Sequence, residues 1–423
     1  MEYSRFGDKF TRHSGVMQLM DDLTDMLRGS GDVQMLAGGN PGVIDEALVA
    51  YRESMARLTA DQAAFNRAFA NYDTPQGRFE FIDALVEMLN SRFGWGISAE
   101  NVVLTNGSQN AFFLLFNLLA GRDKHGRLKK ILLPLTPEYV GYADLAVEED
   151  FFMAEKPLID KLDERTFKYS VDFNALPDSP DIAALCVSRP TNPTGNVLSD
   201  EEVAQLDTIA QQRGIPLIVD NAYGAPFPSI INVDVQPTWN ENTVMCMSLS
   251  KLGLPALRTG IVIANKEIIK ALSSMNAIVN LAPGGLGATL AADLVKSGEL
   301  LRLSHEVIKP FYAEKARLAQ GWFNAAMEGV EAYCHKPEGA IFLWFWFPGL
   351  PISTMELYQR LKKRGVLVVP GQYFFPGIDD PDWAHPHECV RVAFSPDNAA
   401  VEKGIAILGE EVRRAFGKSG PLS

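Results

Sequence analysis

The sequence has few cysteines and little positive charge, and both shortages exclude classes of protein. Only 4 of the 423 residues are cysteine, and none forms a Cys-x-x-Cys pair: Cys186, Cys246, Cys334 and Cys389. Their wide spacing argues against a disulfide framework and favours buried thiols in a reducing cytoplasm. Lysine and arginine number 39 against 52 acidic residues, for a net charge of −13. Because phosphate backbones repel an acidic surface, nucleic acid is not an expected partner.

The sequence also lacks long apolar runs. The longest uninterrupted run, Ala340–Phe347, is far shorter than the ~20 residues that cross a bilayer. The first nine residues contain acids and no apolar stretch, which argues against a signal peptide. We therefore expect a cytoplasmic protein with no membrane partner.

Short apolar runs alternate with helical segments over the middle of the chain. Five runs fit strands that are buried on both faces of a parallel sheet: Lys130–Leu133, Ile182–Val187, Pro216–Val219, Thr243–Ser248 and Gly260–Ile263. The segments with helical periodicity lie between them: Gln109–Leu119, Asp200–Gln212, Lys266–Asn276 and Gly287–Lys296. This alternation predicts the α/β class, with a large, doubly wound, mainly parallel sheet domain over residues 60–300.

The C-terminal part of the chain predicts a smaller α+β domain. One long helix is expected over Ser304–Met327. Strands and helices of mixed order follow it: Ile341–Phe347, Thr354–Arg364, Val366–Val369, Cys389–Ala393 and Asn398–Arg414. We expect residues 1–59 to fold back onto residues 301–423 and to complete this second domain. Two domains also suit a chain of 423 residues, at ~100–200 residues per domain.

A lysine directly after a predicted strand is the centre of the functional argument. Lys251 follows the strand Thr243–Ser248, has hydroxyl groups nearby at Ser248 and Ser250, and precedes Arg258 by seven positions. Most loop lysines are simply solvated. In an open α/β sheet, however, ligands bind outside the carboxyl ends of the strands.

Two other predicted strand ends carry polar side chains. Asp220 ends an apolar strand, and Tyr223 follows it three positions later. A buried carboxylate requires a cationic partner; the alternative is that Asp220 caps the next helix. Asn192 lies in a turn whose prolines and glycine fix its amide, although a turn alone would also explain these residues.

Gly107, Ser108 and Gln109 open an apolar helix. The free N–H groups and the positive end of the helix dipole make such a start an anion site. Taken alone the signal is weak, because most such helix starts are only caps.

Together these motifs resemble the fold type I pyridoxal-phosphate enzymes, in particular the class I and II aminotransferases. Asn192, Asp220, Lys251 and Arg258 follow one another at intervals of 28, 31 and 7 positions, an order and spacing typical of that family. The resemblance extends over almost the whole chain, through Phe6–Gly15, Asn106–Phe113, Ser188–Asn196, Asp220–Pro228 and His335–Trp344.

The resemblance implies roles for the residues that would hold pyridoxal 5′-phosphate. Lys251 would bind the cofactor aldehyde covalently and then transfer protons as general acid and base. Asp220 would pair with the pyridine nitrogen, Tyr223 and Asn192 would hydrogen-bond the ring hydroxyl, and Tyr139 would stack on the ring.

The resemblance also implies a phosphate site and a homodimer. Gly107, Ser108 and Gln109 would bind the phosphate together with Ser248, Ser250 and Arg258, whose planar guanidinium suits phosphate. Tyr72 would reach the phosphate of the neighbouring subunit, so that two chains share each active site.

Two positions are implied to bind the substrate carboxylate. Arg391 lies in a predicted strand between apolar residues, where it needs an anion. In the family the matching arginine binds the α-carboxylate, and an internal ion pair is the alternative. The backbone of Gly39 and the amide of Asn192 would contribute to the same site. His385 and His387 lie in one short loop, but no further ligand indicates a metal site.

Within this family, the resemblance of the flanking sequence implies transfer of the amino group of L-valine to pyruvate, giving 3-methyl-2-oxobutanoate and L-alanine in a ping-pong reaction of amino-acid biosynthesis. The alternatives are an aminotransferase that prefers alanine or methionine and a C–S β-lyase on the same scaffold. A ligand-sensing regulator is less expected, because such proteins carry a separate DNA-binding domain.

Overall fold

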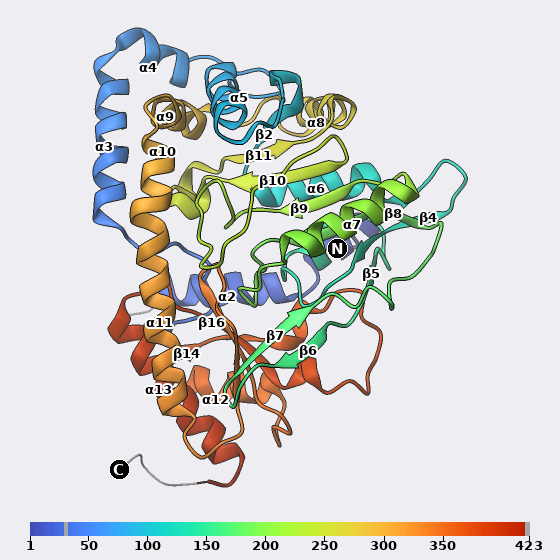
Figure 1. Cartoon of the computed structure of the whole chain (residues 1–423), viewed down its shortest axis with the longest axis vertical. Coiled ribbons are helices and arrows are strands. Elements are labelled where there is room, and N and C mark those ends of the chain that lie inside the picture. Colours follow the sequence, from blue (N-terminus) through green and yellow to red (C-terminus); the bar gives the residue numbers. More distant parts are fainter. Residues whose placement is uncertain (29–32, 419–423) are drawn as a thin grey trace.

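An eight-stranded sheet forms the centre of the larger part of the molecule (Figure 1). The structure, a computed structural model, describes residues 1–28 and 33–418. The strand order is β2 (Val102–Thr105), β11 (Gly260–Ile263), β10 (Thr243–Ser248), β9 (Leu217–Asp220), β8 (Ile182–Ser188), β4 (Leu128–Leu133) and β3 (Gly121–Arg122), with β5 (Phe152–Ala154) also beside β4.

The central strands of this sheet are parallel. β5, β4, β8, β9 and β10 run in one direction, whereas β11 is antiparallel to both of its neighbours and β3 is antiparallel to β4. The predicted α/β class with a mainly parallel sheet is confirmed. The strand β2 was not among the predicted strands.

Helices cover both faces of the sheet because successive residues of a strand point to opposite sides. Cys186 and Ile218 pack in the cluster that includes α6 (Ser108–Leu119), and their neighbours Leu185 and Leu217 pack in the cluster that includes α7 (Asp200–Arg213). The other covering helices are α5 (Phe79–Phe93), α8 (Lys266–Val279) and α9 (Gly285–Lys296).

The second sheet has six strands. Its order is β15 (Val369–Pro370), β16 (Cys389–Ala393), β13 (Phe342–Trp346), β12 (Tyr333–His335), β7 (Thr166–Ser170) and β6 (Leu158–Lys161). The predicted domain boundary assigned residues 158–170 to the larger domain, whereas β7 pairs with β12 of this sheet. This pairing joins segments that are 168 residues apart in the sequence, and no local pattern reveals such a pairing. The division into two domains otherwise stays a prediction.

Three long helices accompany the second sheet, and the N-terminal segment lies beside them. These helices are α11 (Lys309–Ala326), α12 (Thr354–Lys363) and α13 (Asn398–Ala415). β1 (Gln34–Met35) pairs in parallel with β14 (Val366–Leu367), which places part of residues 1–59 against the C-terminal part. The other N-terminal helices are α1 (Arg5–Thr11), α2 (Gly15–Arg28), α3 (Asp45–Ala60) and α4 (Gln62–Phe69).

The single helix predicted over Ser304–Met327 is divided. It begins earlier, with α10 (Glu299–Arg302), continues as a π-helical stretch over Leu303–Ile308, and only then becomes α11. Pro310 in the first turn of α11 lacks a backbone N–H, so the regular hydrogen bond to the preceding turn cannot form there.

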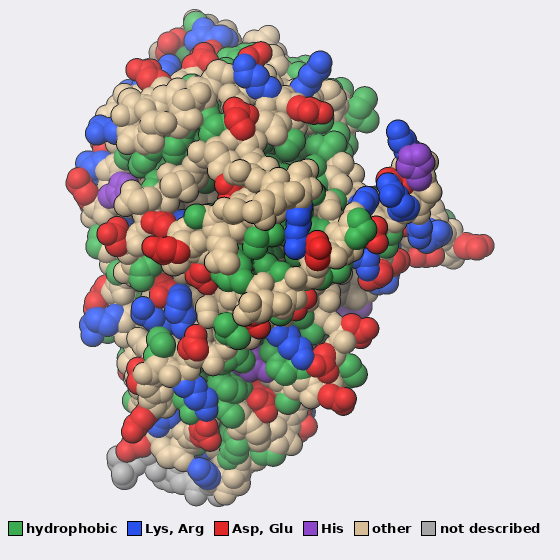
Figure 2. All heavy atoms as spheres, turned by 45° about the vertical axis from the view of Figure 1, so that its right-hand side comes forward, with side chains coloured by type: hydrophobic (Ala, Val, Ile, Leu, Met, Phe, Trp, Pro, Cys, Tyr) green, Lys and Arg blue, Asp and Glu red, His purple; other side chains and the backbone are tan. Residues whose placement is uncertain are grey.

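A hairpin of β3 and β4 projects from the molecule and carries lysine, arginine and histidine side chains (Figure 2). Its charge is partly neutralised by ion pairs, among them Arg127 with Asp123 and Arg122 with Glu148. Among the described residues, no helix is long and apolar enough to cross a membrane.

Candidate active site

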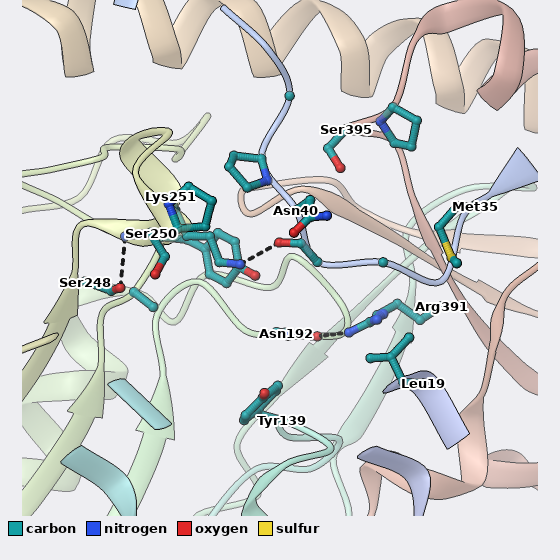
Figure 3. Close-up of a pocket in the computed structure, with 18 of the residues that line it drawn as sticks. Leu19, Met35, Asn40, Tyr139, Asn192, Ser248, Ser250, Lys251, Arg391 and Ser395 are labelled. Carbon is teal, nitrogen blue, oxygen red and sulfur yellow. Dashed lines mark hydrogen bonds between the residues drawn. The ribbon is translucent and has the colours of Figure 1, made fainter. Parts of the chain in front are cut away.

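Lys251 is held at the carboxyl end of β10 by a tight turn. The backbone N–H of Ser250 donates to Ser248 Oγ over 3.0 Å, and the turn Ser250–Leu252 buries the Leu252 side chain. Lys251 therefore projects away from the core. Its Nζ donates to the carbonyl oxygen of Gly39 over 2.6 Å (Figure 3).

The environment of Lys251 favours a neutral amine. Desolvation, together with the charges of Arg391 and Arg258, lowers its pKa from 10.5 to about 8, although Asp220 opposes them. Tyr223 lies beneath the amine, with its ring centroid 5.2 Å from Nζ. Only a neutral amine attacks a carbonyl carbon, so Lys251 is suited to nucleophilic chemistry near neutral pH.

Asp220 lies at the end of the neighbouring strand β9. Its Oδ2 accepts a hydrogen bond from the Tyr142 hydroxyl over 2.7 Å, and its Oδ1 accepts from the Ala222 N–H over 3.1 Å. Burial raises the pKa of Asp220, whereas these two donors and the charge of Lys251 lower it. Asp220 therefore does not serve as a helix cap; its carboxylate is presented to the cavity between the two sheets.

The predicted phosphate site is assembled around a close contact between Gly107 and Arg258. Gly107 has a φ of +87°, and a Cβ there would lie 2.2 Å from Arg258 Nη2, so only glycine fits. Arg258 Nη1 also approaches Ser250 Oγ at 3.4 Å. Helix α6 begins immediately after Gly107, and its first N–H groups and a guanidinium thus meet at one point.

Arg391 is almost completely buried in β16. Nη1 donates to Asn192 Oδ1 over 2.8 Å (Figure 3), and Nη2 donates to the Ala37 carbonyl over 2.5 Å. Its carbon Cζ lies 4.1 Å from the centre of the Phe342 ring, and desolvation lowers its pKa to about 10. Within residues 1–28 and 33–418, no carboxylate pairs with it and its Nε has no partner. A buried guanidinium without a carboxylate is a binding site for an anion.

These groups line one cavity of about 970 Å³ between the two sheets. Of the predicted site residues, the cavity brings together Gly39, Ser108, Gln109, Tyr139, Asn192, Asp220, Tyr223, Ser248, Ser250, Lys251, Arg258 and Arg391. Gly107 lies behind Arg258, outside the lining. Tyr72 does not reach this cavity within one chain, because its side chain is exposed.

The cavity also contains residues that were not predicted. Leu19, Leu23 and Met35 form an apolar side, and Ser188 lies at its base. Tyr142 and Glu138 lie behind Asp220. A signal was available for the last two, since both lie within three residues of Tyr139, just after a predicted strand.

His385 and His387 take no part in this cavity. His385 is buried, and its Nε2 lies 2.5 Å from the Tyr169 hydroxyl. Across the described ranges, no three His, Cys, Asp or Glu residues are grouped so that they could hold a metal ion.

The sequence and structure place the chain in a family. Residues 34–408 match the family of class I and II aminotransferases, to which the chain belongs. The chain is 52% identical to valine–pyruvate aminotransferase of Escherichia coli K12 over 99% of this chain and 100% of that protein.

Solved structures extend the comparison. A protein of Psychrobacter arcticum assigned as an amino-acid aminotransferase superposes with a TM-score of 0.96 at 49% identity, covering 99% of this chain and all of that one. Valine–pyruvate aminotransferase of Salmonella typhimurium superposes with a TM-score of 0.88 at 48% identity, covering 96% of this chain and 100% of that one. The expected fold type I architecture is confirmed.

The cavity fits the cofactor of this family, pyridoxal 5′-phosphate. The donor set matches each part of it: an amine for the aldehyde, a carboxylate for the ring nitrogen, and a guanidinium beside a helix start for the phosphate. Tyr139 lines the same cavity as an aromatic surface. The protein is therefore a pyridoxal-phosphate-dependent aminotransferase.

Proposed function

We propose that the protein transfers the amino group of L-valine to pyruvate, giving 3-methyl-2-oxobutanoate and L-alanine. The observation that carries this proposal is the apolar part of the lining of the cavity that contains Arg391. Leu19 from α2 and Met35 line this cavity together with Arg391 (Figure 3). A substrate bound there through its α-carboxylate would place a small aliphatic side chain against these methyl and thioether groups.

The other cations of the cavity support an apolar substrate. Four lysine or arginine residues line it among the described residues: Lys251, Arg258, Lys315 and Arg391. The first two belong to the cofactor site. Lys315 is held by the Pro396 carbonyl at 2.6 Å and by Asn398 Oδ1 at 2.7 Å. Among the described residues that line the cavity, these assignments leave no further cation for a distal carboxylate, as aspartate or glutamate would require.

The residues around Lys251 would carry out the proton transfers. When bound, pyridoxal phosphate supplies an aldehyde that takes up the amino group and a ring that accepts electrons. The neutral amine of Lys251 would remove the proton from the substrate Cα and deliver it to the carbon that carries the aldehyde in the cofactor. Asp220 would stabilise a proton on the ring nitrogen, and the hydroxyl of Tyr223 and the amide of Asn192 would orient the ring hydroxyl.

Arg391 and its neighbours would orient the substrate. The planar guanidinium suits a bidentate pair with the α-carboxylate. The carbonyl of Gly39 accepts from Lys251 before substrate binds, so the loop that contains Gly39 already lies at the reacting centre. This arrangement fixes which bond at Cα faces Lys251.

A panel of amino donors with pyruvate as acceptor tests the substrate. We expect L-valine and other small aliphatic donors to react within about 10- to 200-fold of each other, since one methylene group is worth only ~1–3 kcal/mol. Aspartate and glutamate should react far more slowly. The measurement is L-alanine formed per unit time. Turnover of aspartate well above valine would refute the proposal, and release of ammonia and pyruvate from cysteine conjugates would favour a β-lyase.

We further propose a homodimer that completes the phosphate site. An exposed apolar segment lies at the C-terminal end of α8, with Ile278 87% and Leu281 65% exposed. Asp73 lies against Gly285, so the exposed Tyr72 adjoins this segment. Large exposed apolar side chains in one region are typical of a protein interface.

This apolar region borders the phosphate end of the cavity. The N–H of Gly284 donates to Asn106 Oδ1 over 2.9 Å, and Asn106 directly precedes Gly107. A second copy docked here by twofold symmetry would bring its own Tyr72 toward that end.

Replacing Ile278 with aspartate should therefore yield monomers with strongly reduced turnover. The physical reason is the burial of a charge in an apolar contact. Analytical sedimentation of wild type and variant gives the mass of the particle in solution. The variant Lys266→Ala, at an exposed position, serves as the surface control. A wild-type protein that sediments as a monomer at micromolar concentration would contradict the proposal.

We also propose a cytoplasmic location. All four cysteines are buried and unpaired in the structure. Cysteines that are buried and form no disulfide are typical of proteins in a reducing compartment.

A further inference from the structure

Glu138 is a buried carboxyl group that the proposed reaction does not use. Its residue is 1% exposed, and it follows Pro137 at the end of the loop after β4. Its backbone N–H donates to the Phe374 carbonyl over 2.8 Å. None of the ion pairs formed by the described residues includes it. A carboxyl group without a cation at this depth has to be explained.

A chain of oxygen atoms links Glu138 to Asp220. Ser188 Oγ lies 2.5 Å from Glu138 Oε2, and the Ser188 N–H donates to Oε1 over 2.8 Å. Ser188 Oγ lies 3.4 Å from the Tyr142 hydroxyl, which donates to Asp220 Oδ2 over 2.7 Å. Ser188 and Asp220 are register partners on adjacent strands, so the sheet fixes the spacing of this chain.

The direction of the donors in this chain depends on one proton. The Tyr142 hydroxyl donates to Asp220 in either case. If Glu138 holds a proton, its O–H can donate to Ser188 Oγ, and the Ser188 hydroxyl is then free to donate to Tyr142. If Glu138 is ionised, Ser188 must donate to Glu138 and not to Tyr142, and two carboxylates then share a desolvated region. Two like charges in one desolvated region repel each other, which disfavours ionisation of Glu138 while Asp220 is ionised.

We propose that Glu138 is a positioning residue that retains a proton and, through Ser188, supplies a hydrogen bond to Tyr142, the donor on Asp220. The function of this chain is to hold Asp220 as the ionised partner of the ring nitrogen. The inference thus rests on the proposed function, in which Asp220 faces that nitrogen.

The surroundings of Glu138 agree with a retained proton. Burial and the charge of Asp220 raise its pKa to about 8, and the two bonds from Ser188 only partly oppose them. The titratable groups that face it from neighbouring elements are Asp220 on β9, Tyr142, and Cys186 on β8, all acids. No basic side chain is among them.

Glu138→Gln is the decisive variant, because glutamine reproduces the protonated acid. Its carbonyl oxygen can accept from the Ser188 N–H, and its NH₂ can donate to Ser188 Oγ. We expect turnover of this variant at pH 7 to stay within tenfold of wild type. A loss of tenfold or more would overturn the proposal, because it would show that the negative charge of Glu138 is required.

The pH dependence of stability gives a readout that does not use turnover. Between an ordinary pKa of 4.5 and about 8, the folded protein binds a proton at Glu138 that the unfolded chain has released. Wild type therefore loses stability as pH rises across this window, and glutamine removes that loss. The melting temperature of Glu138→Gln should rise relative to wild type between pH 5 and pH 8. A constant difference would overturn the proposal.

Infrared spectroscopy of the full-length protein tests the proton directly. With ¹³C-labelled glutamate, wild type at pH 6.5 should show the carbonyl band of a protonated carboxylic acid, and Glu138→Gln should lack it. Glu338→Gln is the matched control, since Glu338 is equally buried but pairs with Lys168 and Lys336. This control should keep the band. Absence of the band from wild type would overturn the proposal even if the glutamine variant did not fold, and would leave the donor panel unaffected.

Discussion

Lys251→Ala is expected to lower turnover of L-valine at least about 10⁴-fold, because it removes both the covalent attachment and the general base. The side chain occupies the centre of the cavity, with its amine 2.6 Å from the Gly39 carbonyl. Among the described lysines that line the cavity, Lys315 is held elsewhere by two acceptors, so no second amine can replace Lys251. The variant should also lose the absorbance of the covalently attached cofactor.

The measurement combines alanine formation with an absorbance spectrum of the purified protein before and after L-valine. Lys266→Ala is the matched control, because Lys266 is exposed and pairs only with Glu100 on the surface. This control should keep both the spectrum and the turnover. Turnover by Lys251→Ala above about 1% of wild type would disprove the assignment of the nucleophile.

Arg391→Lys is expected to weaken the apparent affinity for every amino donor about 30- to 700-fold. Truncating one partner of a buried, hydrogen-bonded charge pair costs about 2–4 kcal/mol, and each 1.4 kcal/mol is a factor of ten. Lysine would keep the charge but lose the planar pair of donors that now contact Asn192 and Ala37. The loss should appear in KM more than in kcat.

Steady-state kinetics with valine and alanine as donors measures this effect. Arg317→Lys is the control, because Arg317 is exposed and pairs only with Glu314 one turn away. Its KM should match that of wild type. An unchanged KM for all donors in Arg391→Lys would show that the carboxylate binds elsewhere.

The sequence predicted those parts of the fold whose signal is local. The strands β8, β9 and β10 appeared as continuous apolar runs because both of their faces are buried. The strands β6 and β7 did not appear, because most of their residues are exposed or polar and their partner strand lies far along the chain. Which sheet they join depends on tertiary contacts alone.

The candidate site was predictable to a similar extent. Lys251, Asp220 and Asn192 each follow a recognisable strand, and parallel strands bring their carboxyl ends to one edge. Arg391 was found because an arginine between apolar residues needs an anion. Leu19 and Met35 could not be found, because an apolar side chain on a helix or short strand has no feature that distinguishes a cavity wall from a core.

The placement of β6 and β7 has a consequence for how the protein can be divided. The chain leaves the large sheet after β5, contributes a hairpin to the other sheet, and returns at β8. A division of the chain at the ends of the large sheet would therefore deprive the six-stranded sheet of its edge strands β6 and β7. The other half would keep this hairpin without the sheet that it pairs with. Neither half can be exchanged by itself as a contiguous segment. Chimaeras with other aminotransferases should therefore exchange the β6–β7 hairpin together with the C-terminal half.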